Sequence, residues 1–285
     1  MTSVRKVNSS DYDLVLPLFK GFATHTQVNP QDWKKIFHPI WGNQRQDYGY
    51  LLEDQGEAVG FLGTLYSNRS ISGKQQEFCN LTSWIVKPEY RAESLSLLFP
   101  LIRCQDLTLT NFTASNRVIE VLLKLGFRSL EDHYRMILPL PFPSGSFELI
   151  TDPGKIAEKL TGTDSAIFHD HKTLHCRHVL MSSPTENCYL VLNPAIKRNR
   201  PVMFINYIGN KDFFVRAIQR CARALCRQLG VQGLMIGDHS LAGKRLPLAL
   251  RIKRRHALLF RSKNVSSLQI DTLYSEIQVL GLKPV

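Results

Sequence analysis

The sequence has no run of about 18 apolar residues, so no transmembrane helix is expected. Its N-terminal stretch, MTSVRKVNSSDYD, is polar and lacks the apolar core of a signal peptide. The six cysteines form no Cys-x-x-Cys pair, and without a secretory signal they predict reduced, mostly buried thiols. Together these absences predict a soluble, cytoplasmic protein.

Acidic residues are scarce in the second half of the chain. Up to Pro143 there are 15 Lys and Arg against 14 Asp and Glu, whereas from Ser144 onward there are 21 against 10. The net charge of +12 therefore resides almost wholly in the second half. Such a surplus favours an anionic partner for that half, which can be phosphate, nucleic acid, acidic glycan or a membrane surface.

The length of the chain predicts two domains, because 285 residues exceed the usual domain size of about 100–200 residues. The stretch LPLPFPSGSFEL (138–149) has three prolines followed by Ser-Gly-Ser, which end regular structure and mark a linker. The charge balance changes at the same place. We therefore expect a first domain over 1–140, a linker over 141–150 and a basic second domain over 151–285.

The first half alternates between helical and strand patterns. Polar caps and apolar stripes predict helices over residues 10–22, 30–37 and 94–103, and another from Ser115 to a stop at Gly126. Apolar runs between turn signals predict the strands Tyr48–Glu53, Ala58–Tyr66, Glu77–Val86, Leu107–Phe112 and Tyr134–Leu138. This order predicts an α/β fold of the α+β kind, a mixed sheet flanked by helices.

The second half repeats the pattern in outline. Strands are predicted over residues 174–181, 188–192, 202–208 and 233–236, with a long helix ended by Gly230 before the last of them. That helix carries a stripe of four arginines, Arg216, Arg220, Arg223 and Arg227. The stripe is typical of a solvated helix face, but like charges at this spacing also favour an anionic partner.

Histidines gather in the segment FHDHKTLHCRH (168–178), which raises the question of a zinc site. Their spacing fits no recurrent structural zinc pattern, and no second ligand cluster follows. No metal is therefore expected.

Three segments of the first half resemble the GNAT acyltransferase superfamily. EDQGEAVGFLGTLYS is similar to the family's hairpin of strands two and three, and NLTSWIVKPEYRAESLSLLFPLI to its fourth strand, phosphate-binding turn and following helix. NFTASNRVIEVLLKLGFRSL is similar to the fifth strand and last helix, with the recurrent Leu-Gly-Phe. The segments stand in the family's order. The resemblance implies an acyl-CoA-binding domain, with a second, degenerate GNAT-like unit in tandem.

The resemblance also implies where an acyl-CoA would bind. The family's turn, Gln/Arg-x-x-Gly-x-Gly/Ala, matches Arg91-Ala92-Glu93-Ser94-Leu95-Ser96, with serine at both small positions. Backbone N–H groups at such a turn hold a pyrophosphate. The interruption of the fourth strand, which exposes N–H donors to the thioester carbonyl, falls near Ile85 and Val86.

The catalytic acid and base that the resemblance implies concern two positions, Leu122 and Glu77. The family's tyrosine, which protonates the departing thiolate, is replaced by Leu122. Glu77, at the start of the fourth strand, is the candidate base. The sequence therefore predicts transfer from acetyl-CoA or another acyl-CoA to the nitrogen or oxygen of an unknown acceptor, and the basic second half favours an anionic one. A non-catalytic CoA- or polyanion-binding module and an aminoacyl-tRNA-dependent transferase, which would bind nucleic acid, stay open as alternatives.

Overall fold

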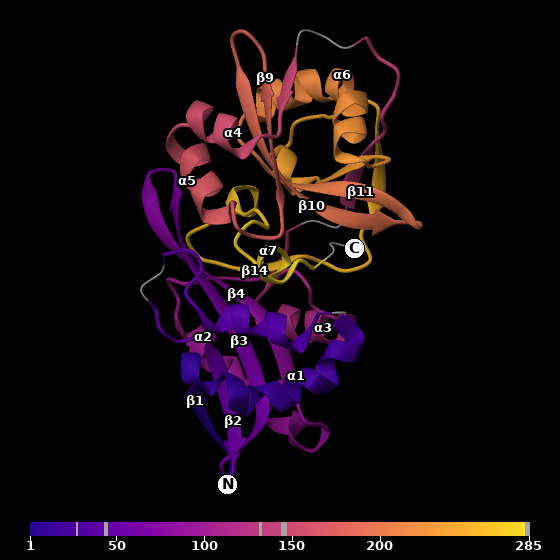
Figure 1. Cartoon of the computed structure of the whole chain (residues 1–285). Helices are drawn as coiled ribbons and strands as arrows, with labels where there is room; N and C mark the ends of the chain where they lie inside the picture. The colour runs from indigo at the N-terminus through magenta and orange to yellow at the C-terminus, as the bar shows by residue number, and fades with distance from the viewer. Residues whose placement is uncertain (27, 43–44, 131–132, 144–146, 283–285) are drawn as a thin grey trace. The chain divides into compact units, whose positions relative to one another are not determined.

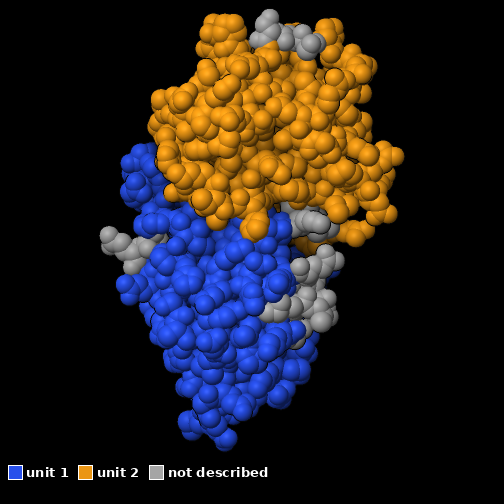
Figure 2. Space-filling model, in the orientation of Figure 1, with its two compact units in different colours: residues 1–128, 259–269, 274–282 blue, residues 129–258, 270–273, 283–285 orange. Residues whose placement is uncertain are grey.

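The computed structural model describes residues 1–26, 28–42, 45–130, 133–143 and 147–282 (Figure 1). The described chain forms two compact units, coloured separately in Figure 2. Unit 1 comprises Met1–Arg128, Leu259–Gln269 and Tyr274–Leu282, and unit 2 comprises Ser129–Leu258 and Ile270–Leu273. Residues 144–146, the Ser-Gly-Ser of the expected linker, lie outside the described residues.

Unit 1 is built on a mixed sheet of seven described strands. In spatial order these are β1 (Ser3–Lys6), β2 (Gly49–Asp54), β3 (Glu57–Ile71), β4 (Lys74–Val86), β5 (Thr108–Asn111), β14 (Leu259–Arg261) and β6 (Arg128–Ser129). Strands β1 to β4 pair in antiparallel fashion, β4 and β5 are parallel, and β14 is antiparallel to β5. The predicted meander and mixed sheet are confirmed.

Helical segments connect and cover this sheet. They are η1 (Ser9–Asp11), α1 (Tyr12–Thr26), η2 (Pro30–Phe37), η3 (Pro88–Leu97), α2 (Phe99–Arg103), α3 (Asn116–Lys124), η5 (Ser267–Gln269) and α7 (Glu276–Leu280). Phe19 of α1 stacks on Trp33 of η2 with ring centroids 4.9 Å apart, and both Phe19 and Phe37 contact Phe61 of β3. These rings bury one face of the sheet and fix α1 and η2 on it.

Unit 2 has its own sheet of seven described strands. Their order is β13 (Ala249–Lys253), β7 (His133–Ile137), β12 (Leu234–Gly237), β11 (Arg200–Ile208), β10 (Asn187–Lys197), β9 (Arg177–Ser182) and β8 (Glu148–Ile150). The helical segments are α4 (Pro153–Lys159), α5 (Gly162–His171), α6 (Lys211–Leu229) and η4 (His239–Leu241). Phe214, Ile218 and Leu225 of α6 pack into the core with Leu190 and Ile205, so the apolar stripe of the sequence faces the sheet.

The two sheets exchange a strand. β7 was expected to close the first sheet, but it lies in the second, between β12 and β13. The corresponding place in the first sheet, between β5 and β6, is taken by β14 from near the end of the chain. The prediction that Tyr134–Leu138 closes the first half is therefore wrong, because an apolar strand pattern does not specify a sheet. For the same reason the compact units differ from the expected ranges 1–140 and 151–285.

Candidate functional site

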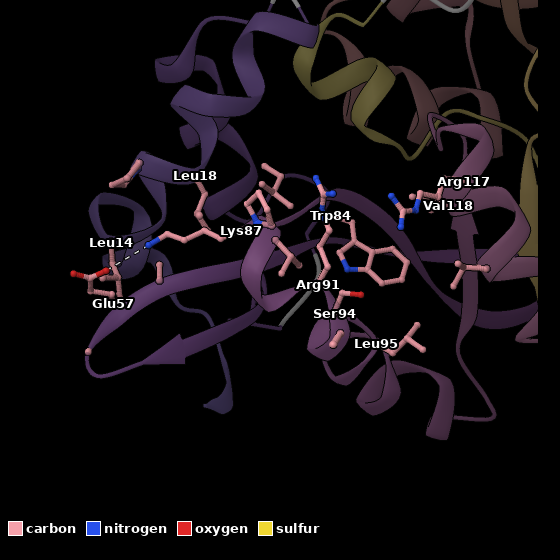
Figure 3. Close-up of a pocket in the computed structure, with 18 residues that line it drawn as sticks. Leu14, Leu18, Glu57, Trp84, Lys87, Arg91, Ser94, Leu95, Arg117 and Val118 are labelled. Atoms are coloured by element: carbon pink, nitrogen blue, oxygen red, sulfur yellow. Dashed lines mark hydrogen bonds and ion pairs between the residues drawn. The ribbon is translucent and has the colours of Figure 1, made fainter. Parts of the chain in front are cut away.

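Unit 1 contains a pocket of about 1080 Å³ beside the end of β4 (Figure 3). Leu14, Pro17 and Leu18 of α1 line one part of it, and Val118 and Val121 of α3 line another. The last three residues of β4 and the start of η3 complete the lining, together with the β2–β3 turn. The pocket is largely apolar and large enough for a small-molecule ligand.

A β-bulge interrupts β4 directly before the pocket. Phe61 of β3 pairs with Ile85, and Gly63 with Thr82, so one β3 residue faces two residues of β4, Ser83 and Trp84. Ser83 has a left-handed backbone, with φ of +51°. The sequence predicted an interruption near Ile85 and Val86. The bulge lies two residues earlier, and Ile85 and Val86 follow it as pocket-lining residues.

Beyond the bulge, β4 and β5 no longer pair. Their parallel ladder consists of three pairs and ends at Asn80 and Thr110. The backbone N–H of Lys87 donates to the carbonyl of Val59 on β3 (2.8 Å). Because N–H directions alternate along a strand, the N–H of Val86 points away from β3, towards the side that β5 has left, whereas that of Ile85 points to β3. Of the two expected donors, only Val86 is therefore oriented towards the gap.

The turn after β4 forms the 3₁₀ helix η3 rather than a loop leading into a long helix. Arg91, Ala92, Ser94 and Leu95 line the pocket. All six residues from 91 to 96 have negative φ, so serine at the two small positions requires no strained backbone. The helix expected over 94–103 is replaced by η3 and the short α2, and Pro100 lies in the first turn of α2, where proline is tolerated.

Glu93 and Ser96 are not among the residues that line the pocket. The Glu93 carboxylate accepts a hydrogen bond from the Thr2 hydroxyl, and the Ser96 hydroxyl donates to the Glu93 carbonyl (2.6 Å). Both side chains thus serve the local structure of unit 1.

Three cationic side chains border the pocket: Lys87, Arg91 and Arg117. Lys87 pairs with Glu57 at 3.4 Å, the contact dashed in Figure 3. Among the described residues, neither Arg91 nor Arg117 forms an ion pair. Two uncompensated guanidinium groups at the rim of an apolar pocket favour an anionic ligand group there. Arg117 was not a sequence candidate, because only the fold brings the start of α3 to the turn after β4.

Glu77 does not line this pocket. It lies near the start of β4, eight residues before Ile85, and its carboxylate accepts two hydrogen bonds from Arg45 (2.6 and 2.9 Å). The Arg45 guanidinium also lies over the Tyr66 ring, 4.5 Å from its centroid. Glu77 and Arg45 border a separate cavity of about 700 Å³.

Leu122 is fully buried in the core beneath α3, whereas Val118 and Val121 face the pocket. We predict that Leu122→Tyr destabilises the protein by about 1–3 kcal/mol through overpacking and does not raise turnover. Urea unfolding and thiol release measure the two effects. Leu123→Tyr is the matched control, because Leu123 is 47% exposed on the same helix. A Leu122→Tyr variant that is faster than wild type and equally stable would contradict the assignment of this position to the core.

Unit 2 also has a bulged strand, β11, but the carboxylate of Asp164 occupies the turn that follows it. Asn206 is the extra residue in β11, and the β11–β12 ladder ends one residue earlier, at Ile205. The turn that leads into α6 starts at Gly209, and the Asp164 carboxylate lies where a side chain on Gly209 would project. Tyr207 donates to Asp164 (2.6 Å), and burial raises the pKa of Asp164, a shift that this hydrogen bond partly offsets. The place corresponding to the turn after β4 is therefore occupied in unit 2.

Several other sequence candidates of unit 2 have partners within that unit. His171 is buried and contacts the carbonyls of Ile167 and Leu273 (2.9 and 3.3 Å), and His178 contacts the Tyr189 hydroxyl (2.6 Å). No three His, Cys, Asp or Glu side chains of the described residues are grouped to hold a metal ion. On α6, Arg216 pairs with Glu186 at 2.7 Å, while Arg220, Arg223 and Arg227 are exposed. Of the helices that the structure describes, none has the length and hydropathy needed to span a membrane.

Comparison with known proteins identifies the fold. No family model and no curated protein sequence matches the chain. The structure of a GCN5-related N-acetyltransferase from Anabaena variabilis matches with a TM-score of 0.60 and 12% identity, over 94% of this chain and 74% of that one. The chain has a GNAT fold. An Enterococcus faecalis protein described as a probable N-acyltransferase gives a TM-score of 0.58 and 11% identity, over 94% and 74% of the two chains. A GCN5-related N-acetyltransferase from Kribbella flavida gives 0.55 and 11%, over 94% and 72%.

These matches extend over nearly the whole chain, so they include both units. The fold predicted from the three sequence segments is confirmed. The bulge of β4 and its divergence from β5 are features of this structure itself.

Proposed function

We propose that unit 1 binds an acyl-CoA and transfers its acyl group to an acceptor that attacks the thioester directly. The observation that carries the proposal is the bulged end of β4, which separates from β5 beside an apolar pocket. Two arginines at the rim of this pocket have no ion-pair partner in the part of the chain that the structure describes. Acyl-CoA has the complementary composition: an anionic pyrophosphate, a long neutral arm and a thioester. The GNAT fold supports the general class, acyl transfer from CoA, and leaves the acceptor unspecified.

Each part of the pocket has a proposed role. Arg91 and Arg117 would attract the pyrophosphate, and the backbone around Ser94 would approach it closely. Ile85 and the valines of α3 would contact the neutral arm. The Val86 N–H would donate to the thioester oxygen, where negative charge develops as the acceptor attacks. Catalysis would then come mainly from positioning and this donor. The tyrosine that protonates the departing thiolate in the family is replaced here by Leu122.

We propose a single CoA site per chain. In unit 2 the Asp164 carboxylate fills the turn before α6, and a second anion there would be repelled. The remaining basic surface of unit 2, with Arg220, Arg223 and Arg227 exposed on α6, fits an anionic partner other than CoA.

The experiment that tests the CoA site is Ser94→Glu. A carboxylate at this position would face the pyrophosphate, and we expect CoA to bind at least about 30-fold more weakly, equivalent to about 2 kcal/mol. Isothermal titration calorimetry measures the change. Ser70→Glu, which adds the same charge at an exposed position of β3, is the control. Equal CoA affinity in wild type and Ser94→Glu would refute a pyrophosphate site at η3.

A further inference from the structure

A buried carboxyl group from the end of the chain lies inside unit 1. Glu276 starts α7, and its side chain is fully buried. Its Oε1 accepts a hydrogen bond from the Thr113 hydroxyl, and its backbone N–H donates to Asn80 Oδ1 (3.2 Å). Asn80 in turn donates from Nδ2 to the Thr110 hydroxyl (3.2 Å). Glu276 is thus held by β4 on one side and by the segment after β5 on the other.

These contacts place Glu276 where β4 and β5 begin to diverge. Asn80 and Thr110 form the last pair of the parallel ladder, and the bulge of β4 starts three residues after Asn80. Thr113 is exposed and belongs to the short loop between β5 and α3. The first turn of α3, which follows this loop, contains Arg117, a residue that lines the pocket. The carboxyl group therefore lies beside the last pair of the β4–β5 ladder, next to the point from which the two strands separate towards the pocket.

The second oxygen of this carboxyl group, Oε2, has no hydrogen-bond partner among the described residues. A buried carboxyl oxygen without a donor is costly, so the site favours a ligand that brings an N–H or O–H. The groups that contact Glu276 are neutral. Four charged side chains on β3, β4 and η2 have other partners: Arg69 lies over Tyr274, Glu77 pairs with Arg45, Asp32 pairs with Lys35, and Lys34 lies over Tyr12.

We infer that Glu276 is the general base of unit 1 and that it accepts the proton of a primary amine acceptor. The inference rests on the proposed function. The amine nitrogen forms a bond to the thioester carbonyl carbon, the C–S bond breaks, and one nitrogen proton passes to Oε2. That proton then returns through solvent to the CoA thiolate, so the products are an amide and free CoA.

The environment of Glu276 suits a base that works near neutral pH. Burial raises its pKa to about 7, although the hydrogen bonds from Thr113 and Asn80 act in the opposite direction. A base of this strength is substantially ionised at pH 7 and still accepts a proton from the attacking amine.

The test compares wild type with Glu276→Gln in the full chain, using acetyl-CoA with methylamine, ethanolamine and glycinamide as amine probes. We expect kcat/KM at pH 7 to fall at least about 100-fold and the acidic limb of the pH–rate profile near pH 7 to disappear. CoA affinity, measured by calorimetry, should stay unchanged. Thr113→Val, which removes a donor to the carboxylate, should move the limb to higher pH. Glu120→Gln, at an exposed position on α3, is the matched control.

The outcomes separate this inference from the proposed function. If the wild-type protein did not bind CoA, the proposed function itself would be wrong. Firm CoA binding with no thiol release for any of the three amines would overturn the inference and leave the CoA site. An unchanged limb in Glu276→Gln, or its loss in Glu77→Gln instead, would also overturn it. Since glutamine is nearly isosteric with glutamate, retained CoA binding shows that the variant is folded.

Discussion

Leu259→Asp is expected to unfold unit 1, although residue 259 lies far beyond the first half of the sequence. Leu259 is fully buried in β14, between β5 and β6 in the first sheet. Losing its packing and burying an unpaired carboxylate should cost at least about 4 kcal/mol, a large fraction of the stability of about 5–15 kcal/mol that a domain typically has. Hydrogen exchange followed by mass spectrometry should show lost protection in peptides from β3, β4 and β5. CoA binding should be lost with it.

The reciprocal change is Ile137→Asp. Ile137 of β7 is fully buried, pairs with Leu234 of β12 and packs in the core of unit 2. We expect this variant to remove protection first from β10, β11 and β12. Leu268→Asp, at a position 55% exposed in unit 1, controls for the added charge. If Ile137→Asp instead exposed β3 to β5 while unit 2 stayed protected, the strand exchange would be wrong.

The stability of unit 1 is expected to fall as the pH rises from about 4.5 to about 7. Burial raises the pKa of Glu276 from 4.5 to about 7, so the folded chain holds a proton in this range that the unfolded chain has released. Raising the pH therefore favours unfolding, by up to about 3 kcal/mol. Within unit 1, Asp11, whose pKa is lowered by a hydrogen bond from Arg5, titrates at lower pH and does not cancel the effect. In unit 2, burial lowers the pKa of His171 and His178, which acts in the opposite direction, so the contribution of Glu276 is measured as a difference from a variant without this carboxyl group.

Urea unfolding of wild type and Glu276→Gln at pH 5 and pH 8 measures this contribution. The variant should lose less stability between the two pH values, because glutamine does not titrate. Glu120→Gln should behave as wild type. Equal losses in wild type and Glu276→Gln would show that the buried carboxyl group is ionised throughout.

Local patterns made much of unit 1 predictable. The hairpin of β2 and β3 follows from apolar runs around a turn, and α3 ends as its sequence predicts, with Gly126 at φ of +85° after the C-cap. The bulge was expected two residues late, because neither Ser83 nor Trp84 is a residue type that marks a bulge. The 3₁₀ geometry of η3 was missed for a similar reason, since its composition is that of an ordinary helix start.

Long-range features could not be predicted. Leu259–Arg261 is only three residues long, and nothing in it specifies pairing with a strand about 150 residues earlier in the chain. Glu276 carries no local signal either, because its environment is made by Asn80 and Thr113. The sequence directed attention to Glu77 because it lies on β4, yet the structure pairs that carboxylate with Arg45.

The position of β14 has a consequence for synthesis on the ribosome. When β5 emerges, its antiparallel neighbour is about 150 residues away, which at 5–20 residues per second is roughly 7–30 s of translation. During that interval the edge of β5 has no partner and is open to wrong pairing, including with a second nascent chain. The unit whose residues are made first is thus completed last, and a molecular chaperone that covers β5 would increase the yield of folded protein.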